Sequence, residues 1–120
     1  MRPLRDAVDE KGGSVRQLIG YVPVDSGQIV IIDPCYLQDW KHGEYDPDTA
    51  GEPRNDYEAV CRLTVGDSNF GEIERGTVHG VASRTAYGDG VYPVYAELDR
   101  VGGRPLKLTI YFEGGPDDEN

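Results

Sequence analysis

The chain has 120 residues and a formal net charge of −10 at pH 7, with 38% hydrophobic and 28% charged residues. That length suits one domain with its own hydrophobic core, and the negative charge disfavours a grip on the phosphate backbone of nucleic acids. No apolar run approaches the roughly 20 residues of a membrane span, and no secretory signal pattern is present. We therefore expect a cytoplasmic protein with reduced cysteines that binds neither nucleic acid nor membrane.

Composition shifts along the chain predict three parts. Residues 1–16 mix charges of both signs and break at Gly12-Gly13, which is typical of a mobile N-terminal arm. A single β-rich domain is expected over residues 17–113. The acidic residues 114–120 are expected to form a frayed C-terminal tail.

The first half of the domain predicts three strands and a loop. QLIGYVPV at 17–24 and QIVII at 28–32 are separated by a short turn, which favours a hairpin. Because residues 29–32 are apolar without alternation, the second strand is expected at the centre of a sheet. Residues 41–56 lack periodicity and predict a long surface loop. YEAVCRLTV at 57–65 alternates and predicts a strand that points Cys61 into the core.

The second half predicts further short strands separated by turns. Strand-like stretches occur around residues 70–75, at 76–86 and at 90–99, and VGGR then predicts the turn of a hairpin into PLKLTIYF. Many short strands with one plausible helix favour a mainly β fold. We expect an antiparallel β-sandwich or a small barrel of six to seven strands, with one short helix near residues 34–40.

The stretch IIDPCYLQDW at 31–40 has a structural and a chemical interpretation. Asp33 suits an N-cap and Pro34 the first helical position, so a short helix explains the pattern locally. Alternatively, the start of that helix lowers the pKa of Cys35 and makes it a nucleophile, with His42 or His79 as the candidate base. The capping interpretation is favoured, because no cysteine-enzyme motif surrounds these residues.

A second candidate lies in ASRTAYGDGVYPVY at 82–95. Gly88-Asp89-Gly90 suits a tight turn and also a loop that binds hydroxyl groups. A cation and several phenols stand around it, which is a common set for holding a small polar ligand or a peptide. Together with the turn at 33–36, the predicted ligand-binding residues are Asp33, Tyr36, Arg84, Tyr87, Asp89, Tyr92 and Tyr95.

Two blocks, SGQIVIIDPCYL at 26–37 and ASRTAYGDGVYPVYAE at 82–97, resemble a family of small proteins of actinobacteria, other bacteria and their phages. The resemblance implies a β-rich domain and assigns no activity. It makes the sequestering of a small molecule, or the blocking of a host protein, a hypothesis by analogy.

Three hypotheses about function follow. The leading one is a binding protein without catalytic activity, whose ligand is a small polar molecule or a protein partner. The alternatives are a small enzyme that uses Cys35 or Asp33 with His79, and a structural protein that forms homo-oligomers through an edge strand. No cofactor or metal is expected, because the cysteines and histidines show no zinc spacing and no nucleotide-binding motif is present.

Overall fold

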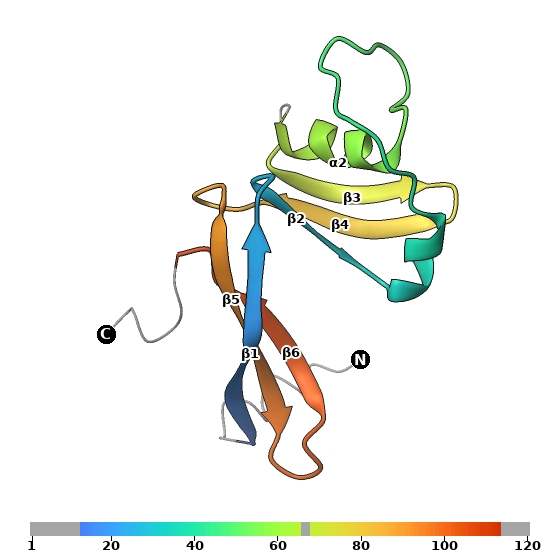
Figure 1. Cartoon of the computed structure of the whole chain (residues 1–120). Helices are drawn as coiled ribbons and strands as arrows, with labels where there is room; N and C mark the ends of the chain where they lie inside the picture. The colour runs from blue at the N-terminus through green and yellow to red at the C-terminus, as the bar shows by residue number, and fades with distance from the viewer. Residues whose placement is uncertain (1–12, 66–67, 114–120) are drawn as a thin grey trace. The chain divides into compact units, whose positions relative to one another are not determined.

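The computed structural model describes residues 13–65 and 68–113. Six strands in this part of the chain form two three-stranded sheets, so the expected mainly β class is confirmed. The regular elements there are β1 (Ser14–Val24), β2 (Gln28–Ile32), the 3-10 helix η1 (Pro34–Asp39), the α-helix α2 (Asp56–Val65), β3 (Phe70–Arg75), β4 (Val78–Arg84), β5 (Gly90–Asp99) and β6 (Pro105–Ile110) (Figure 1).

The chain divides into two compact units, Met1–Pro23 with Gly90–Asn120, and Val24–Asp89. The first unit holds the sheet β1-β5-β6, and the second holds the sheet β2-β4-β3 with η1 and α2. Strand β1 begins at Ser14, inside the segment that we expected to be an arm. The rest of that arm, residues 1–12 with their predicted mobility, lies outside the described residues, as does the predicted tail at 114–120.

In the first unit, β5 and β6 form the antiparallel hairpin that VGGR predicts. Val94 pairs with Ile110 at one end of the ladder, and the register shifts once, between Glu97 and Leu98. Gly102 and Gly103 form the turn with φ of 100° and 70°. Glycine is favoured at such positive φ because it has no Cβ to clash with the backbone.

The predicted hairpin between residues 17–24 and 28–32 is wrong, because β1 and β2 belong to different sheets. The expected central position of 28–32 is wrong as well: β4 is the centre of its sheet and β2 is an edge. The apolar run of 29–32 predicted a strand covered on both faces, but its side chains alternate between a covered face and an exposed face. Val30 and Ile32 pack against the core, whereas Ile31 is 58% exposed.

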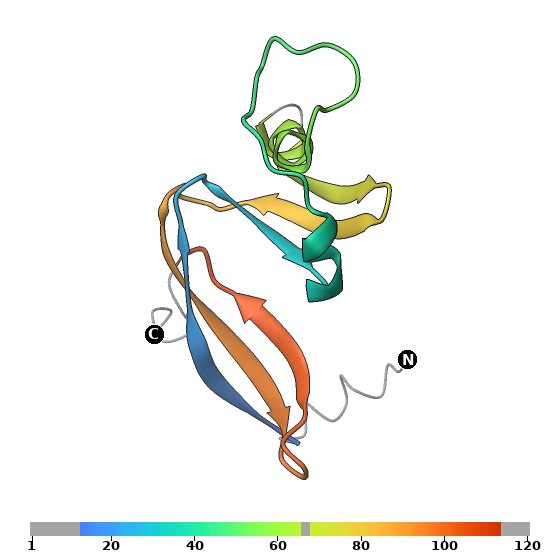
Figure 2. The ribbon, with the colours of Figure 1, turned by 45° about the vertical axis from the view of Figure 1, so that its right-hand side comes forward.

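In the second unit, α2 covers one face of the sheet β2-β4-β3. It lies against β3 and β4 in both views (Figure 1, Figure 2). The core between helix and sheet contains the buried residues Val60, Ile73, Val78 and Ala82. The β3–β4 hairpin turns through two residues, Gly76 with φ 59° and Thr77, a short connection that suits antiparallel strands.

The predicted strand at 57–65 is wrong, because these residues form α2. Asn55 caps the helix: its Oδ1 accepts a hydrogen bond from Glu58 N–H at 2.8 Å, and its backbone carbonyl accepts one from Ala59 N–H at 3.1 Å. A capping residue followed three positions later by Glu marks a helix start. The capping pattern predicts a helix, whereas the alternation of apolar residues predicts a strand, and the segment forms a helix. Cys61 is buried, as expected, but on a helix.

Candidate functional site

A cavity of about 750 Å³ lies in the second unit, where three segments meet. These are the end of η1, the start of α2 with the long loop that precedes it, and the turn between β3 and β4. The volume falls within the roughly 300–1,000 Å³ of typical ligand sites. The lining residues are Gln38, Asp39, Trp40, Lys41, Glu52, Asp56, Glu74, Arg75, Gly76, Thr77 and Val78.

Trp40 and Lys41 enter the cavity wall because the chain leaves η1 there. Trp40 is the C-cap of η1, its backbone N–H donating to Leu37 O at 3.1 Å, and its half-buried ring packs against the core. The backbone of the next residue is tied to α2 by two hydrogen bonds: Lys41 N–H donates to the side-chain Oδ2 of Asp56 at 2.5 Å, and Lys41 O accepts from Asp56 N–H at 2.9 Å. The end of η1 is therefore fixed to the start of α2.

Asp56 is the buried carboxylate of this wall. It is 1% exposed, and its Oδ1 accepts from Arg75 Nη1 at 2.5 Å. A buried carboxylate needs such partners, because desolvation without them is costly. The guanidinium of Arg75 also donates from Nη2 to Pro53 O at 3.0 Å, so it joins β3, the loop and the helix.

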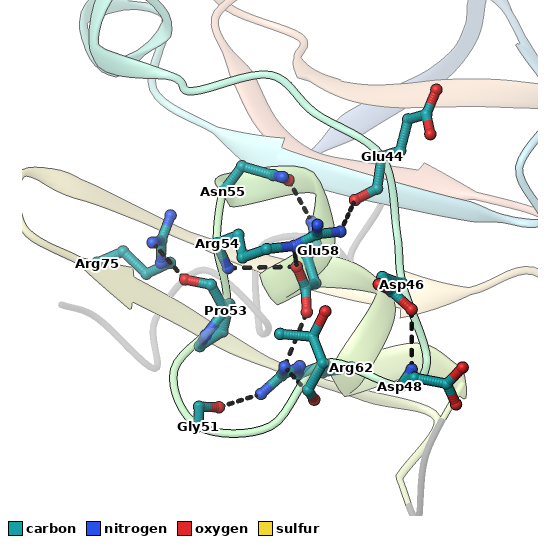
Figure 3. A network of polar contacts seen from close by, with 11 residues as sticks. Glu44, Asp46, Asp48, Gly51, Pro53, Arg54, Asn55, Glu58, Arg62 and Arg75 are labelled. Carbon is teal, nitrogen blue, oxygen red and sulfur yellow. Dashed lines mark hydrogen bonds and ion pairs between the residues drawn. The ribbon is translucent and has the colours of Figure 1, made fainter.

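Glu58, two residues further along α2, organises the long loop beside the cavity. The side chain is fully buried and pairs with two arginines: Arg54 Nε lies 2.9 Å from Oε1, and Arg62 Nη2 lies 2.7 Å from Oε2 (Figure 3). The Arg54 backbone N–H donates to Oε1 as well, at 3.2 Å. These contacts, the Arg54 side chain first, hold the pKa of Glu58 below its ordinary value.

The same two arginines hold the loop backbone. Arg54 Nη2 donates to Glu44 O at 3.1 Å, and Arg62 donates to Gly51 O at 2.5 Å and to Thr49 O at 3.0 Å (Figure 3). One buried carboxylate thus positions two cations, and the cations position three carbonyls of a loop that has no regular structure of its own. The loop that supplies Glu52 to the cavity is ordered by this network.

The structure confirms Asp33 as the N-cap of η1. Its Oδ1 accepts from Cys35 N–H at 2.9 Å, which lowers the pKa of Asp33, and Pro34 takes the first helical position. Tyr36, on the same helix, packs against His79 of β4 with ring centroids 5.8 Å apart. Asp33, Tyr36 and His79 are therefore brought to one end of the sheet.

Cys35, in the first turn of η1, is exposed. Partial desolvation, together with the negative charges of Asp33 and Asp39, raises the pKa of its thiol. This direction is opposite to the lowered pKa on which the catalytic alternative depends. Within the described residues, no hydrogen bond joins Cys35 to His79 or His42.

The other predicted ligand-binding residues lie elsewhere. Arg84 pairs with Gln28, at the start of β2, so it stands at the opposite end of this sheet from Asp33. Tyr87 and Asp89 follow it and are exposed. Arg84 lines a smaller cavity of about 280 Å³, together with Ser26, Gly27, Gln28, Thr64, Val65 and Gly88.

Tyr92 and Tyr95 belong to the first unit. Tyr92 is buried and meets Phe112 edge to face at 5.5 Å, and Tyr95 meets Tyr111 at 5.6 Å. Both rings thus take part in packing within that unit. Of the predicted ligand-binding residues in the second unit, Asp33 and Tyr36 lie at one end of its sheet and Arg84 at the other.

Sequence reasoning missed the cavity. It gives no binding role to Trp40, Lys41 or Arg75. One signal could have pointed to this region. Asn55 followed three positions later by Glu58 is a helix-start pattern, and it predicts that the loop after Trp40-Lys41 ends at a helix.

No protein-family model, curated protein or solved structure matches this chain. Neither helix in the described part of the chain is long and apolar enough to cross a membrane. Over the same residues, no group of three or more His, Cys, Asp or Glu side chains is placed to hold a metal ion.

Proposed function

We propose that the protein is a small cytoplasmic binding protein without catalytic activity, and that the cavity beside Trp40 holds a small polar ligand. The observation that carries the proposal is the cavity wall itself, which combines an aromatic ring with ionised side chains from three separate segments. Ligand sites typically join an apolar surface to a few convergent polar groups. The Glu58 network supports the proposal, because it orders the loop that forms part of the wall.

Two finer expectations stay predictions. One is the arrangement of the strands as a sandwich or small barrel. The other is the resemblance to the small proteins of bacteria and phages, with the sequestering role that it suggests. The proposed binding function depends on neither, since it is argued from a cavity within one unit.

The enzyme alternative has less support. Its nucleophile would be Cys35, whose raised pKa leaves a smaller thiolate fraction at neutral pH than an ordinary cysteine has. A base within hydrogen-bond reach is the other requirement, and the only ring contact of His79 among the described residues is with Tyr36.

A ligand screen tests the binding function. Trp40 is the single tryptophan of the chain, so its fluorescence reports on the cavity. A panel of nucleotides, sugars, amino acids and amines is titrated while the fluorescence and the melting temperature are recorded. We expect at least one class to raise the melting temperature and to change the fluorescence.

Variants then locate the site. If the cavity is the binding site, Glu52→Gln alters the affinity, whereas Arg84→Ala and Asp89→Ala, at the site predicted from sequence, leave it unchanged. The opposite pattern would return the site to the 84–95 segment. A panel without any stabilising ligand would contradict the binding function.

A second candidate, self-association, is favoured by one feature of the edge strand β2. Ile31 is exposed there and pairs with Val81, which is exposed too, on the sheet face opposite α2. Edge strands offer free backbone groups to a second copy of the chain. Light scattering at increasing concentration tests this candidate: a dimer that Ile31→Lys dissociates would support it, and a monomer throughout would exclude it.

A further inference from the structure

We infer that the ligand of the Trp40 cavity carries a positive charge, as an ammonium or guanidinium group next to an apolar part. This inference rests on the proposed binding function and names the chemical class of the ligand. Its basis is the balance of charge around the cavity, the state of each charged group there, and the aromatic ring among them.

The cavity wall has a net negative charge. Four carboxylates line it against two cations, which leaves a net charge of −2. The carboxylates come from different segments: Asp39 ends η1, Glu52 lies in the long loop, Asp56 begins α2 and Glu74 is near the end of β3. Acidic residues from four separate segments therefore contribute to the wall.

The pairing within the wall leaves carboxylates available. Arg75 is engaged by Asp56, so that buried pair contributes no free charge. Asp39 accepts one hydrogen bond, from Thr77 Oγ1 at 2.9 Å, and has no ion-pair partner among the described residues. Glu74 has one ion-pair contact among the described residues: its Oε2 lies 3.7 Å from Nδ1 of His79. The Glu74 side chain is 78% exposed.

Lys41 is the one cation of the wall that Asp56 does not neutralise. Apart from the Asp56–Arg75 pair, the lining holds one ammonium group and the carboxylates of Asp39, Glu52 and Glu74, so an anionic ligand would gain one attraction and meet three repulsions. The charge of the whole chain, −10, acts in the same direction: it raises the local concentration of cations and lowers that of anions.

Trp40 adds a second kind of attraction for the same ligand class. Among aromatic side chains, tryptophan binds cations best through its ring face, and it also accepts apolar groups. A half-buried tryptophan in the same wall as carboxylates that outnumber the cations is thus suited to an organic cation. A small inorganic cation would leave the ring unused.

The test uses three probes that share a phenyl ring and differ in charge: 2-phenylethylammonium, 2-phenylethanol and phenylacetate. Each is titrated into the full chain at fixed ionic strength, with Trp40 fluorescence and calorimetry as readouts and N-acetyltryptophanamide as the control for direct quenching. We expect the ammonium probe to bind at least tenfold more tightly than phenylacetate, and its affinity to fall as salt is added.

Variants assign the effect to the cavity. Glu52→Gln and Glu74→Gln are expected to weaken the ammonium probe about three- to tenfold, and Lys41→Gln to strengthen it about threefold. The matched control is Glu72→Gln, which removes the same charge from the same strand outside the cavity and should leave the affinity within about twofold. All four side chains belong to exposed residues, so the variants are expected to fold, and their melting temperatures verify this.

The outcomes separate the inference from the function on which it rests. If phenylacetate or the neutral alcohol binds as tightly as the ammonium probe, the cationic class is overturned while the binding function stands. Equal losses in Glu72→Gln and Glu52→Gln would overturn the assignment to the cavity. If no probe binds, the inference fails; a different ligand from the wider screen would then still support the binding function.

Discussion

Glu58 is the side chain on which the order of the long loop depends. It is buried, and both of its oxygens accept from arginines that in turn hold loop carbonyls. Glu58→Gln keeps the shape and removes the charge. At pH 7 we expect the melting temperature to fall by roughly 10 °C, because two arginines lose their buried partner.

The pH dependence of this effect follows from the lowered pKa of Glu58. A depressed carboxyl pKa contributes stability above the ordinary value of about 4.3, and that stability is lost as pH falls through the folded-state pKa. The difference between the wild type and Glu58→Gln should therefore shrink below about pH 4.3. Glu44→Gln, an exposed loop carboxylate, is the control. Equal melting temperatures of the wild type and Glu58→Gln at pH 7 would contradict the stabilising role of Glu58.

The two cysteines should react very differently. Cys35 is exposed and Cys61 is buried in the helix–sheet core, so a disulfide reagent such as DTNB should modify one thiol in the native protein and the second after unfolding. Because the pKa of Cys35 is raised, its rate at pH 7.5 should lie below that of an unstructured cysteine peptide. Cys35→Ser should remove the native reaction. Persistence of that reaction in Cys35→Ser would show that the core opens.

At the scale of single elements, the β2–β4 pairing depends on Gly80. A Cβ at this position would lie 2.6 Å from Ile31 O, a backbone atom that moves only if the strand moves. Gly80→Ala should cost about 1–3 kcal/mol, as overpacking does elsewhere. The control is Gly20→Ala in β1, where nothing lies within 4 Å of the added Cβ. Urea unfolding measures both, and an equal effect would contradict the close approach of the strands.

Local signals predicted the elements whose contacts are local. The β5–β6 hairpin follows from VGGR, and Asp33-Pro34 predicted the cap of η1. The strand prediction for residues 57–65 is wrong because it relied on the apolar alternation of Tyr57, Ala59, Cys61 and Leu63 and gave too little weight to the helix-capping pattern of Asn55 and Glu58. A short segment whose apolar residues fit both the helical period of about 3.6 residues and the strand period of about 2 becomes helix or strand according to the elements that pack against it.

At the scale of the whole molecule, the two units should differ in local stability. The second has a core of four side chains no more than 3% exposed, whereas β1 and β6 of the first carry exposed apolar residues such as Ile19 and Leu108. Amide hydrogen exchange should therefore be slowest in α2, β3 and β4, and faster in β1 and β6. Uniform protection would contradict this division.

The sequence by itself determined the mainly β class, the negative charge and the local turns and caps, because each depends on composition or on residues within a few positions of one another. The tertiary structure alone decided that β2 is an edge, that 56–65 is a helix against β3 and β4, and that the candidate site is a cavity. The contacts that build it join distant residues: Lys41 with Asp56, and Asp56 with Arg75. Their meeting depends on how the helix packs on the sheet, which no local pattern encodes.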